Sequence, residues 1–181
     1  VSIAQYLMTV EYKPYPPSFY HIDQLKSLTR FRDSLVRQHS RQLVELTNIL
    51  DKVFPEFKPF FDGRFSATAL YILTHYQSPE KIANMNAKSY EALRKKSRGK
   101  FSMVKFAQLK TLAKNTVGRS DAFLLKQMEI TIDIENQLDA KIDEIESQIL
   151  ECIRALNPPI LTIPGIGELT AAIILSEYGN I

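Results

Sequence analysis

The sequence contains a single cysteine, Cys152, so no disulfide can form within the chain. One thiol fits a reducing compartment, and we therefore expect a cytoplasmic protein. No apolar run approaches the roughly 18 residues that a membrane-spanning helix needs, and no basic segment followed by a short apolar one indicates a signal peptide. We expect no membrane partner.

Patterns for metal binding or catalysis are also missing. The histidines lie far apart and lack the spacing of metal ligands, so we expect each to face solvent or to be satisfied locally: His21, His39 and His75. There is neither a phosphate loop with its lysine nor a nucleophile elbow. Several crowded acids are better explained as the solvated face of a helix: Asp139, Asp143, Glu144 and Glu146. The sequence predicts no catalytic residue, no metal site and no cofactor in this chain.

The charge of the chain is unevenly distributed. The formal net charge is only +3, but residues 88–119 contain ten basic side chains and one acid, a net charge of +9. Residues 121–151 contain nine acids and two lysines, a net charge of −7. A concentrated positive segment of this kind indicates contact with a polyanion.

Hydrophobic periodicity predicts two long helices of about 37 residues, each about 55 Å long. The first covers residues 20–57 and the second residues 121–156, where a heptad seam runs through Leu138, Ile142, Ile145, Ile149, Cys152 and Leu156. Residues 58–118 predict a cluster of shorter helices, including a basic helix over residues 87–96. Ser78 before Pro79 predicts one helix start, and Ser120 or Asp121 another.

The predicted fold is all-α, with a long antiparallel helical hairpin and the short helices as a helical head at its far end. The same apolar seams could instead pair between two chains, and the sequence leaves both arrangements open. We expect three consecutive parts. Residues 1–19 would be the tail of an upstream domain and a proline-rich linker, residues 20–157 the coiled-coil region with its head at 58–118, and residues 158–181 the start of a C-terminal domain.

Residues 157–178 carry the motif with the clearest chemical meaning. Asn157 is placed to cap a short helix, residues 164–167 (Pro-Gly-Ile-Gly) predict a tight turn, and a second helix follows. This is the pattern of a helix–hairpin–helix motif. Its glycines let the backbone approach a phosphate, which the N-terminus of the second helix attracts. We expect Ile163 and Ile166 to anchor the turn to the core.

Three segments resemble the DEDD insertion-sequence transposases related to the Piv DNA invertase. Residues 163–167, with residues 170–172 and 176–179 after them, are similar to the opening of that family's C-terminal domain. Residues 2–7 resemble the stretch that follows the last aspartate of its RuvC-like domain. Residues 25–36 and the Phe-Pro-Glu of residues 54–56 resemble its arginine-rich long helix.

The resemblance implies a fragment that carries neither catalytic centre. The chain begins with Val1 rather than Met and stops at Ile181 directly after a helical pattern, so we expect an internal piece. The family's metal-binding acids would precede Val1, and its nucleophilic serine would follow Ile181; Ser176 lies too close to the turn to be that serine. A divalent metal is expected only for the missing RuvC-like domain. The family's coiled coil implies a homo-oligomer formed through the long helices, and its partners are DNA and, for some members, a structured guide RNA.

We therefore expect a nucleic-acid-binding and assembly segment of a transposase. The predicted contact residues are Pro164, Gly165, Ile166, Gly167, Arg94, Lys95, Lys96, Arg98 and Lys100. Four arginines of the first long helix are weaker candidates: Arg30, Arg32, Arg37 and Arg41. Two alternatives stay open, a stand-alone helix–hairpin–helix DNA-binding module and a purely structural coiled-coil scaffold. The first of these should contain a second hairpin, and the sequence shows none.

Overall fold

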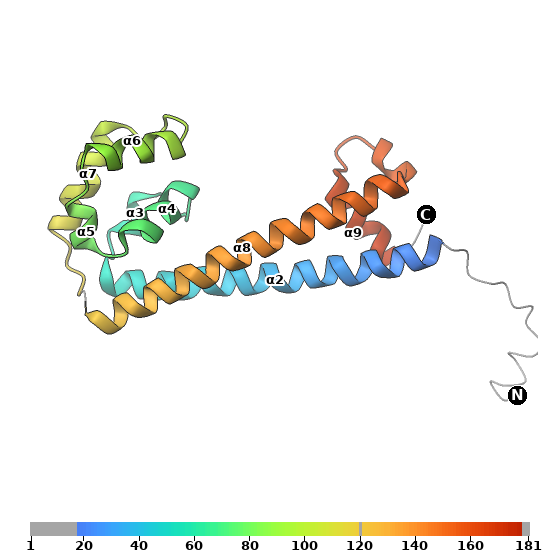
Figure 1. The fold of residues 1–181 in the computed structure, drawn as a ribbon, viewed down its shortest axis with the longest axis horizontal. Coiled ribbons are helices and arrows are strands. Elements are labelled where there is room, and N and C mark those ends of the chain that lie inside the picture. The colour runs from blue at the N-terminus through green and yellow to red at the C-terminus, as the bar shows by residue number, and fades with distance from the viewer. Residues whose placement is uncertain (1–17, 120, 179–181) are drawn as a thin grey trace, which may run out of the picture. The chain divides into compact units, whose positions relative to one another are not determined.

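The computed structural model describes residues 18–119 and 121–178. The expected tail and proline-rich linker before residue 18 lie outside the described residues. Within them the fold is all-helical, as predicted, and contains no strand (Figure 1). The elements are α2 (Ser18–Val53), α3 (Phe57–Phe60), α4 (Ala67–Tyr76), α5 (Pro79–Ala83), α6 (Ala87–Lys96), α7 (Met103–Lys114), α8 (Ala122–Leu156), the 3₁₀ turn η1 (Pro159–Thr162) and α9 (Glu168–Tyr178).

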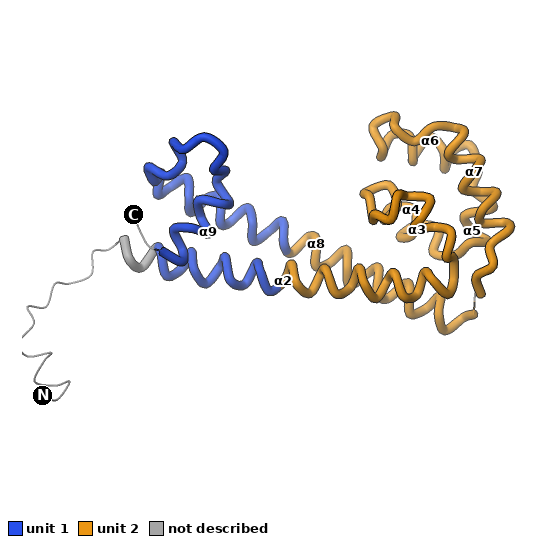
Figure 2. The backbone as a smooth tube through the Cα atoms, turned by 180° about the vertical axis from the view of Figure 1, so that it is seen from behind, with its two compact units in different colours: residues 1–34, 142–181 blue, residues 35–141 orange. Residues whose placement is uncertain are grey.

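The chain divides into two compact units, and both long helices contribute to each (Figure 2). The first unit comprises residues 1–34 and 142–181, and the second comprises residues 35–141. The three consecutive parts expected from the sequence stay a prediction.

The helices α2 and α8 form an antiparallel hairpin within one chain, so the predicted helical hairpin is confirmed. In the second unit, His39 pairs with Glu135, and Glu45 accepts a hydrogen bond from Gln127 at 3.0 Å. The numbering rises along α2 while it falls along α8, which defines the antiparallel direction. In the first unit, Leu25 of α2 packs in one cluster with Ile149 of α8.

Local signals set the helix boundaries. The Ser78 hydroxyl caps α5 by accepting the backbone N–H of Lys81, and Pro79 occupies the first helical position, as predicted. Asp121 caps α8, because its carboxylate accepts the N–H groups of Phe123 and Leu124, both at 2.9 Å. The first long helix ends at Val53 rather than at residue 57, since Pro55 cannot continue the hydrogen-bond ladder.

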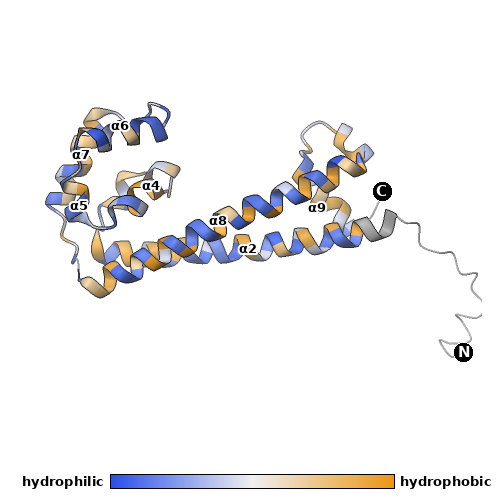
Figure 3. Cartoon of the chain, viewed as in Figure 1, coloured by the Kyte–Doolittle hydropathy of each residue, from blue (hydrophilic) through white to orange (hydrophobic). Residues whose placement is uncertain are grey.

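Each unit has its own apolar core, to which buried residues of both α2 and α8 contribute. Figure 3 shows apolar and polar residues alternating along both long helices. The second unit has the larger core, built from the last turns of α2, the short helices and the start of α8. In the first unit, Ala171 and Ala172 are fully buried against α2 and α8, and their small side chains let α9 approach closely.

The heptad seam predicted for α8 coincides only in part with the residues that are buried. Ile142 and Ile149 are buried, whereas the other four predicted seam residues are half-buried. Four of the buried positions of α8 repeat at intervals of seven: Met128, Glu135, Ile142 and Ile149. One position of this repeat is therefore a carboxylate.

Candidate nucleic-acid interface

The positive segment of residues 88–119 lies on the surface of the helical head. Nine of its ten basic side chains are exposed: Lys88, Arg94, Lys95, Lys96, Arg98, Lys100, Lys105, Lys114 and Arg119. The tenth, Lys110, is half-buried, and its ammonium donates to the backbone carbonyl of Met85. Among the described residues, no carboxylate forms an ion pair with any of the ten. The positive charge is therefore available to a polyanion.

Helix α6 positions the densest part of this charge. It begins with a capping box in which Asn86 and Ser89 each accept the other's backbone N–H. Leu93 is fully buried and fixes one face of the helix to the core, so Arg94, Lys95 and Lys96 project from its exposed last turn. Cations in a last turn are also favoured by the helix dipole.

The turn after α6 holds Arg98 in an unusual backbone conformation. The N–H of Gly99 donates to Arg94 O at 2.8 Å, and the N–H of Arg98 donates to Lys95 O at 3.1 Å. These two bonds form a Schellman motif, in which the position of Arg98 normally belongs to glycine. Arg98 has φ +50°, a left-handed conformation that L-residues adopt at a cost. An arginine at this position therefore presents its charge at some expense of stability.

The glycine turn is exposed in the first unit. Ile166 N donates to Ile163 O at 3.2 Å, and Gly165 has φ +89°, so residues 163–166 form a type II turn that needs glycine at its third position. Gly167 does not adopt a positive φ. Its carbonyl accepts the N–H of Ala171, so it is the residue directly before the first turn of α9. Pro164, Gly165 and Gly167 are exposed.

The short helix predicted before the turn is the four-residue 3₁₀ helix η1. Two other details of this motif differ from the sequence-based expectation. Asn157 does not cap η1; with φ +39°, Asn157 instead ends α8 in the left-handed conformation that asparagine tolerates. Ile163 is 50% exposed and does not anchor the turn, whereas Ile166 packs against the core.

Glu168 stands at the first position of α9, where a carboxylate would repel a phosphate. Arg154 of α8 neutralises it through a two-pronged ion pair, with 2.9 Å from Nε to Oε1 and 2.7 Å from Nη2 to Oε2. The hydrogen bonds and charge of Arg154 lower the pKa of Glu168, so the carboxylate stays ionised and paired.

Two of the weaker arginine candidates on α2 are paired with carboxylates. Arg30 forms a two-pronged pair with Glu177, and Arg32 Nε donates to Glu146 at 2.8 Å. Arg41 is exposed, as is Arg37, which has an interaction partner. The charges of Arg30 and Arg32 are therefore already compensated by carboxylates of the first unit.

Two arrangements escaped the sequence analysis. His39, which showed no ligand spacing, contacts Glu135 with 2.9 Å between Nε2 and Oε1, and Glu135 is only 1% exposed. Phe60, Phe61 and Phe101 line a cavity on the head, together with cations and hydroxyl groups. The spacing of His39 and Glu135 along the chain, 96 residues, gives no local signal for their contact.

The described residues contain no group of three or more metal-ligating side chains placed to hold an ion. The divalent metal implied by the resemblance therefore has no ligand set in residues 18–119 and 121–178. Ser176 is buried, and its hydroxyl donates to Ile173 O and accepts from the Thr29 hydroxyl. No helix in the part of the chain described here is long and apolar enough to span a membrane.

Comparison with known families gives one match. The model of the DEDD transposase family of the IS110 type, described as Transposase, matches residues 1–55. Within the described part of that segment lie α2 and the turn that ends it. No curated protein and no solved structure matches the chain. Residues 1–55 are thus similar to an insertion-sequence transposase of this type.

Proposed function

We propose that this chain is a nucleic-acid-binding and assembly segment of an insertion-sequence transposase. The observation that carries the proposal is the exposed set of cations on the head, which no carboxylate among the described residues neutralises. Elsewhere the same chain pairs its charges, as in Arg30–Glu177 and Arg154–Glu168. The cations of the head, by contrast, form no ion pair with the described carboxylates. The transposase match over residues 1–55 supports a nucleic acid as the polyanion.

The contacts made by the basic side chains after α6 and by the glycine turn would be to phosphates, which carry no base sequence. Arg94, Lys95, Lys96, Arg98 and Lys100 lie in or directly after the last turn of α6 and offer side-chain donors to phosphate oxygens. The glycine turn offers a second contact, since the first N–H groups of α9 have no partner in the helical ladder. The pairing of Glu168 with Arg154 lowers the electrostatic cost of bringing a phosphate there.

The long helices would serve assembly with a second copy. On α8, Phe123, Ile130 and Ile134 are exposed, and their spacings of seven and four place them on one side of the helix. An apolar stripe of this kind on a long helix is typical of a surface that pairs with another helix. Light scattering of the chain and of an Ile130→Glu/Ile134→Glu variant tests this: we expect the variant to be monomeric at concentrations where the parent chain associates.

DNA is the expected ligand, and a guide RNA transcribed from the element is a second one. We further propose that the segment works in the cytoplasm and neither cuts nor joins DNA by itself. Metal-dependent strand transfer by the pure chain would contradict the last point.

The decisive experiment is binding to labelled duplex DNA and to structured RNA across a salt series. The logarithm of the affinity should fall by roughly 0.9 for each phosphate contacted on duplex DNA as the logarithm of salt concentration rises. The test variants reverse the charges of Arg94, Lys95 and Lys96 or replace Gly165. The matched control is Lys126→Glu, a reversal on α8 at a lysine already paired with Glu129.

We expect steep salt dependence that the head variants reduce and the control does not. If neither ligand binds at low salt, the proposal fails, and a structural scaffold becomes the better explanation. If one ligand binds and the other does not, the result identifies which nucleic acid the head serves.

A further inference from the structure

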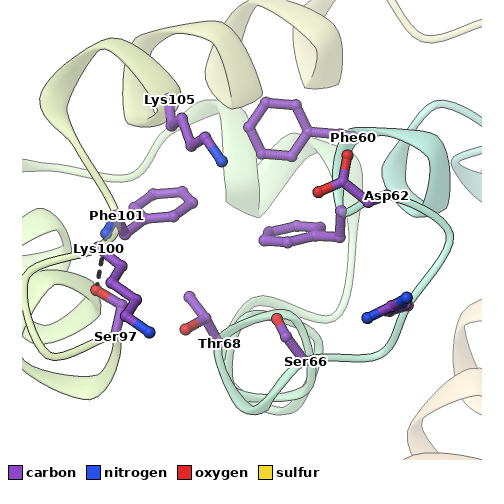
Figure 4. A pocket seen from close by; sticks show the side chains of 10 residues that line it. Phe60, Asp62, Ser66, Thr68, Ser97, Lys100, Phe101 and Lys105 are labelled. Carbon is purple, nitrogen blue, oxygen red and sulfur yellow. Dashed lines mark hydrogen bonds between the residues drawn. The ribbon is translucent and has the colours of Figure 1, made fainter.

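The head contains a cavity of about 530 Å³, at the low-to-middle part of the roughly 300–1,000 Å³ range typical of small-molecule sites. All of its lining residues belong to the second unit, from α3 and the turn after it, the start of α4, the segment between α6 and α7, and the first turn of α7 (Figure 4). The lining combines three chemistries: aromatic rings, cationic side chains and hydroxyl groups. Lys100, already a predicted contact residue, is part of it, so the cavity adjoins the proposed phosphate-binding segment.

The aromatic part of the lining is a fixed surface. The rings of Phe61 and Phe101 are nearly parallel, with an interplanar angle of 12° and centroids 6.2 Å apart. Phe60 meets Phe61 edge to face at 5.0 Å. Phe101 is only 4% exposed, and its backbone N–H donates to the Ser97 hydroxyl at 3.0 Å. The packing thus holds the rings in place before any ligand arrives.

The polar part of the lining carries uncompensated positive charge. Arg64, Lys100 and Lys105 are exposed, and none of them forms an ion pair with the described carboxylates. Asp62 also lines the cavity and supplies hydrogen-bond acceptors, and its carboxylate points toward the interior beside Phe60 (Figure 4). Ser66 caps α4 by accepting the N–H of Ala69 through its hydroxyl oxygen, which leaves that hydroxyl's own proton to donate.

We propose that this cavity binds one unstacked nucleotide of a single-stranded nucleic acid, an inference that rests on the proposed function. The base would lie on the half-buried ring of Phe61, which the buried Phe101 ring holds in place, and the phosphates would contact Lys100, Lys105 and Arg64. Asp62 would accept a hydrogen bond from an exocyclic amino group, which adenine, cytosine and guanine carry and uracil and thymine lack. An inorganic anion would leave the rings unused, and an apolar ligand would leave three cations without a partner.

The geometry favours an unpaired base over a duplex. A base stacked inside a helix has both faces covered, so it cannot lie on an aromatic ring without leaving the stack. Proteins that hold single strands combine aromatic rings with a cationic path for the backbone. The head has both, because the basic last turn of α6 leads through residues 97–100 to the cavity.

Single strands of one sequence test the proposal, made as DNA and as RNA, each with and without an abasic position. Removing the contacted base should weaken binding by roughly five- to one-hundred-fold, the measured range for loss of one base–aromatic contact. A 2-aminopurine at that position should lose fluorescence on binding the wild-type chain. In Phe61→Leu and Phe101→Leu the quenching should be lost while the salt dependence stays. Phe31→Leu is the matched control, since Phe31 is 53% exposed and outside the cavity.

Photo-crosslinking of strands that carry 5-iodocytosine, a base that keeps its exocyclic amino group, tests the proposal on the wild-type chain if a leucine variant does not fold. We expect adducts on peptides that contain residues 60–61 or 101. Adducts confined to other peptides, or equal affinity for intact and abasic strands, would overturn the proposal. If either result occurs while binding still depends steeply on salt, only the cavity proposal fails and the proposed function stands. If the chain binds no strand at low salt, both fail. Comparison of the DNA and RNA strands identifies which of them supplies the nucleotide.

Discussion

The carboxylate in the hairpin seam gives the sharpest test of the structure. Glu135 occupies one of the positions that repeat every seven residues along α8, where Met128, Ile142 and Ile149 are apolar. Its partner is His39 on α2, whose side chain is 23% exposed. Burial raises the pKa of Glu135 above its ordinary value of 4.5; the charge and hydrogen bond of His39 oppose this shift, and nearby Asp139 adds to it.

The sign of the pH dependence follows from this shift. A carboxyl group whose folded pKa is raised stabilises the fold when it is protonated. That contribution is complete below the ordinary value and is lost as pH rises through the raised folded pKa. In Glu135→Gln this contribution to the pH dependence disappears. We therefore expect the variant to lose less stability than the parent chain between about pH 4 and neutral pH.

Replacing His39 alone should lower the stability more than replacing His39 and Glu135 together. Removing one partner of a buried hydrogen bond leaves the other unsatisfied at a cost of about 1–3 kcal/mol, and we expect a cost in this range for His39→Leu. Replacing both residues by leucine completes the apolar seam and should be neutral or stabilise by about 1 kcal/mol relative to the parent chain. A change of 1 kcal/mol corresponds to about 2–4 °C in Tm for a chain of this size.

Urea unfolding followed by circular dichroism, at several pH values between 4 and 8, measures all four proteins. Asp143→Asn, at an exposed acid on the same helix, serves as the control. A cost below about 0.5 kcal/mol for His39→Leu at neutral pH would refute the reasoning, as would identical pH profiles for the parent chain and Glu135→Gln.

Three further predictions concern the turns. A Cβ at Gly118 would lie 2.1 Å from the carbonyl oxygen of Val53, so we expect Gly118→Ala to lower the free energy of unfolding by about 3 kcal/mol. A Cβ at Gly167 meets nothing within 4 Å, so Gly167→Ala should lower it by less than about 1 kcal/mol. Equal melting temperatures of the two variants would contradict this. Arg98→Gly should raise stability by about 0.5 kcal/mol because glycine adopts the positive φ freely. Arg98→Gly should also weaken nucleic-acid binding. If the variant loses stability as well as affinity, the weaker binding would not show that Arg98 contacts phosphate. Arg154→Gln should weaken binding at the glycine turn by exposing the Glu168 carboxylate, and adding Glu168→Gln should restore the affinity measured by fluorescence anisotropy.

Much of the fold was determined by the sequence alone, because its signals are local. The basic helix begins and ends where its pattern predicted, at residues 87 and 96, and Ser78 with Pro79 starts α5. These features depend on side chains within about four residues of one another, where caps and helical periodicity act. The same holds for the long helices and for Gly165, whose turn needs a positive φ.

Other features were decided only by tertiary structure, because they join residues far apart in the chain. Nothing near Glu135 distinguishes it from the exposed acids of α8; only the approach of His39 on α2 makes it a buried partner. Gly118 is another example, because its need for glycine comes from the backbone of Val53, 65 positions earlier, lying against it. The cavity on the head exists because Phe61 and Phe101 meet across 40 positions of sequence, and periodicity carries no information about contacts at that range.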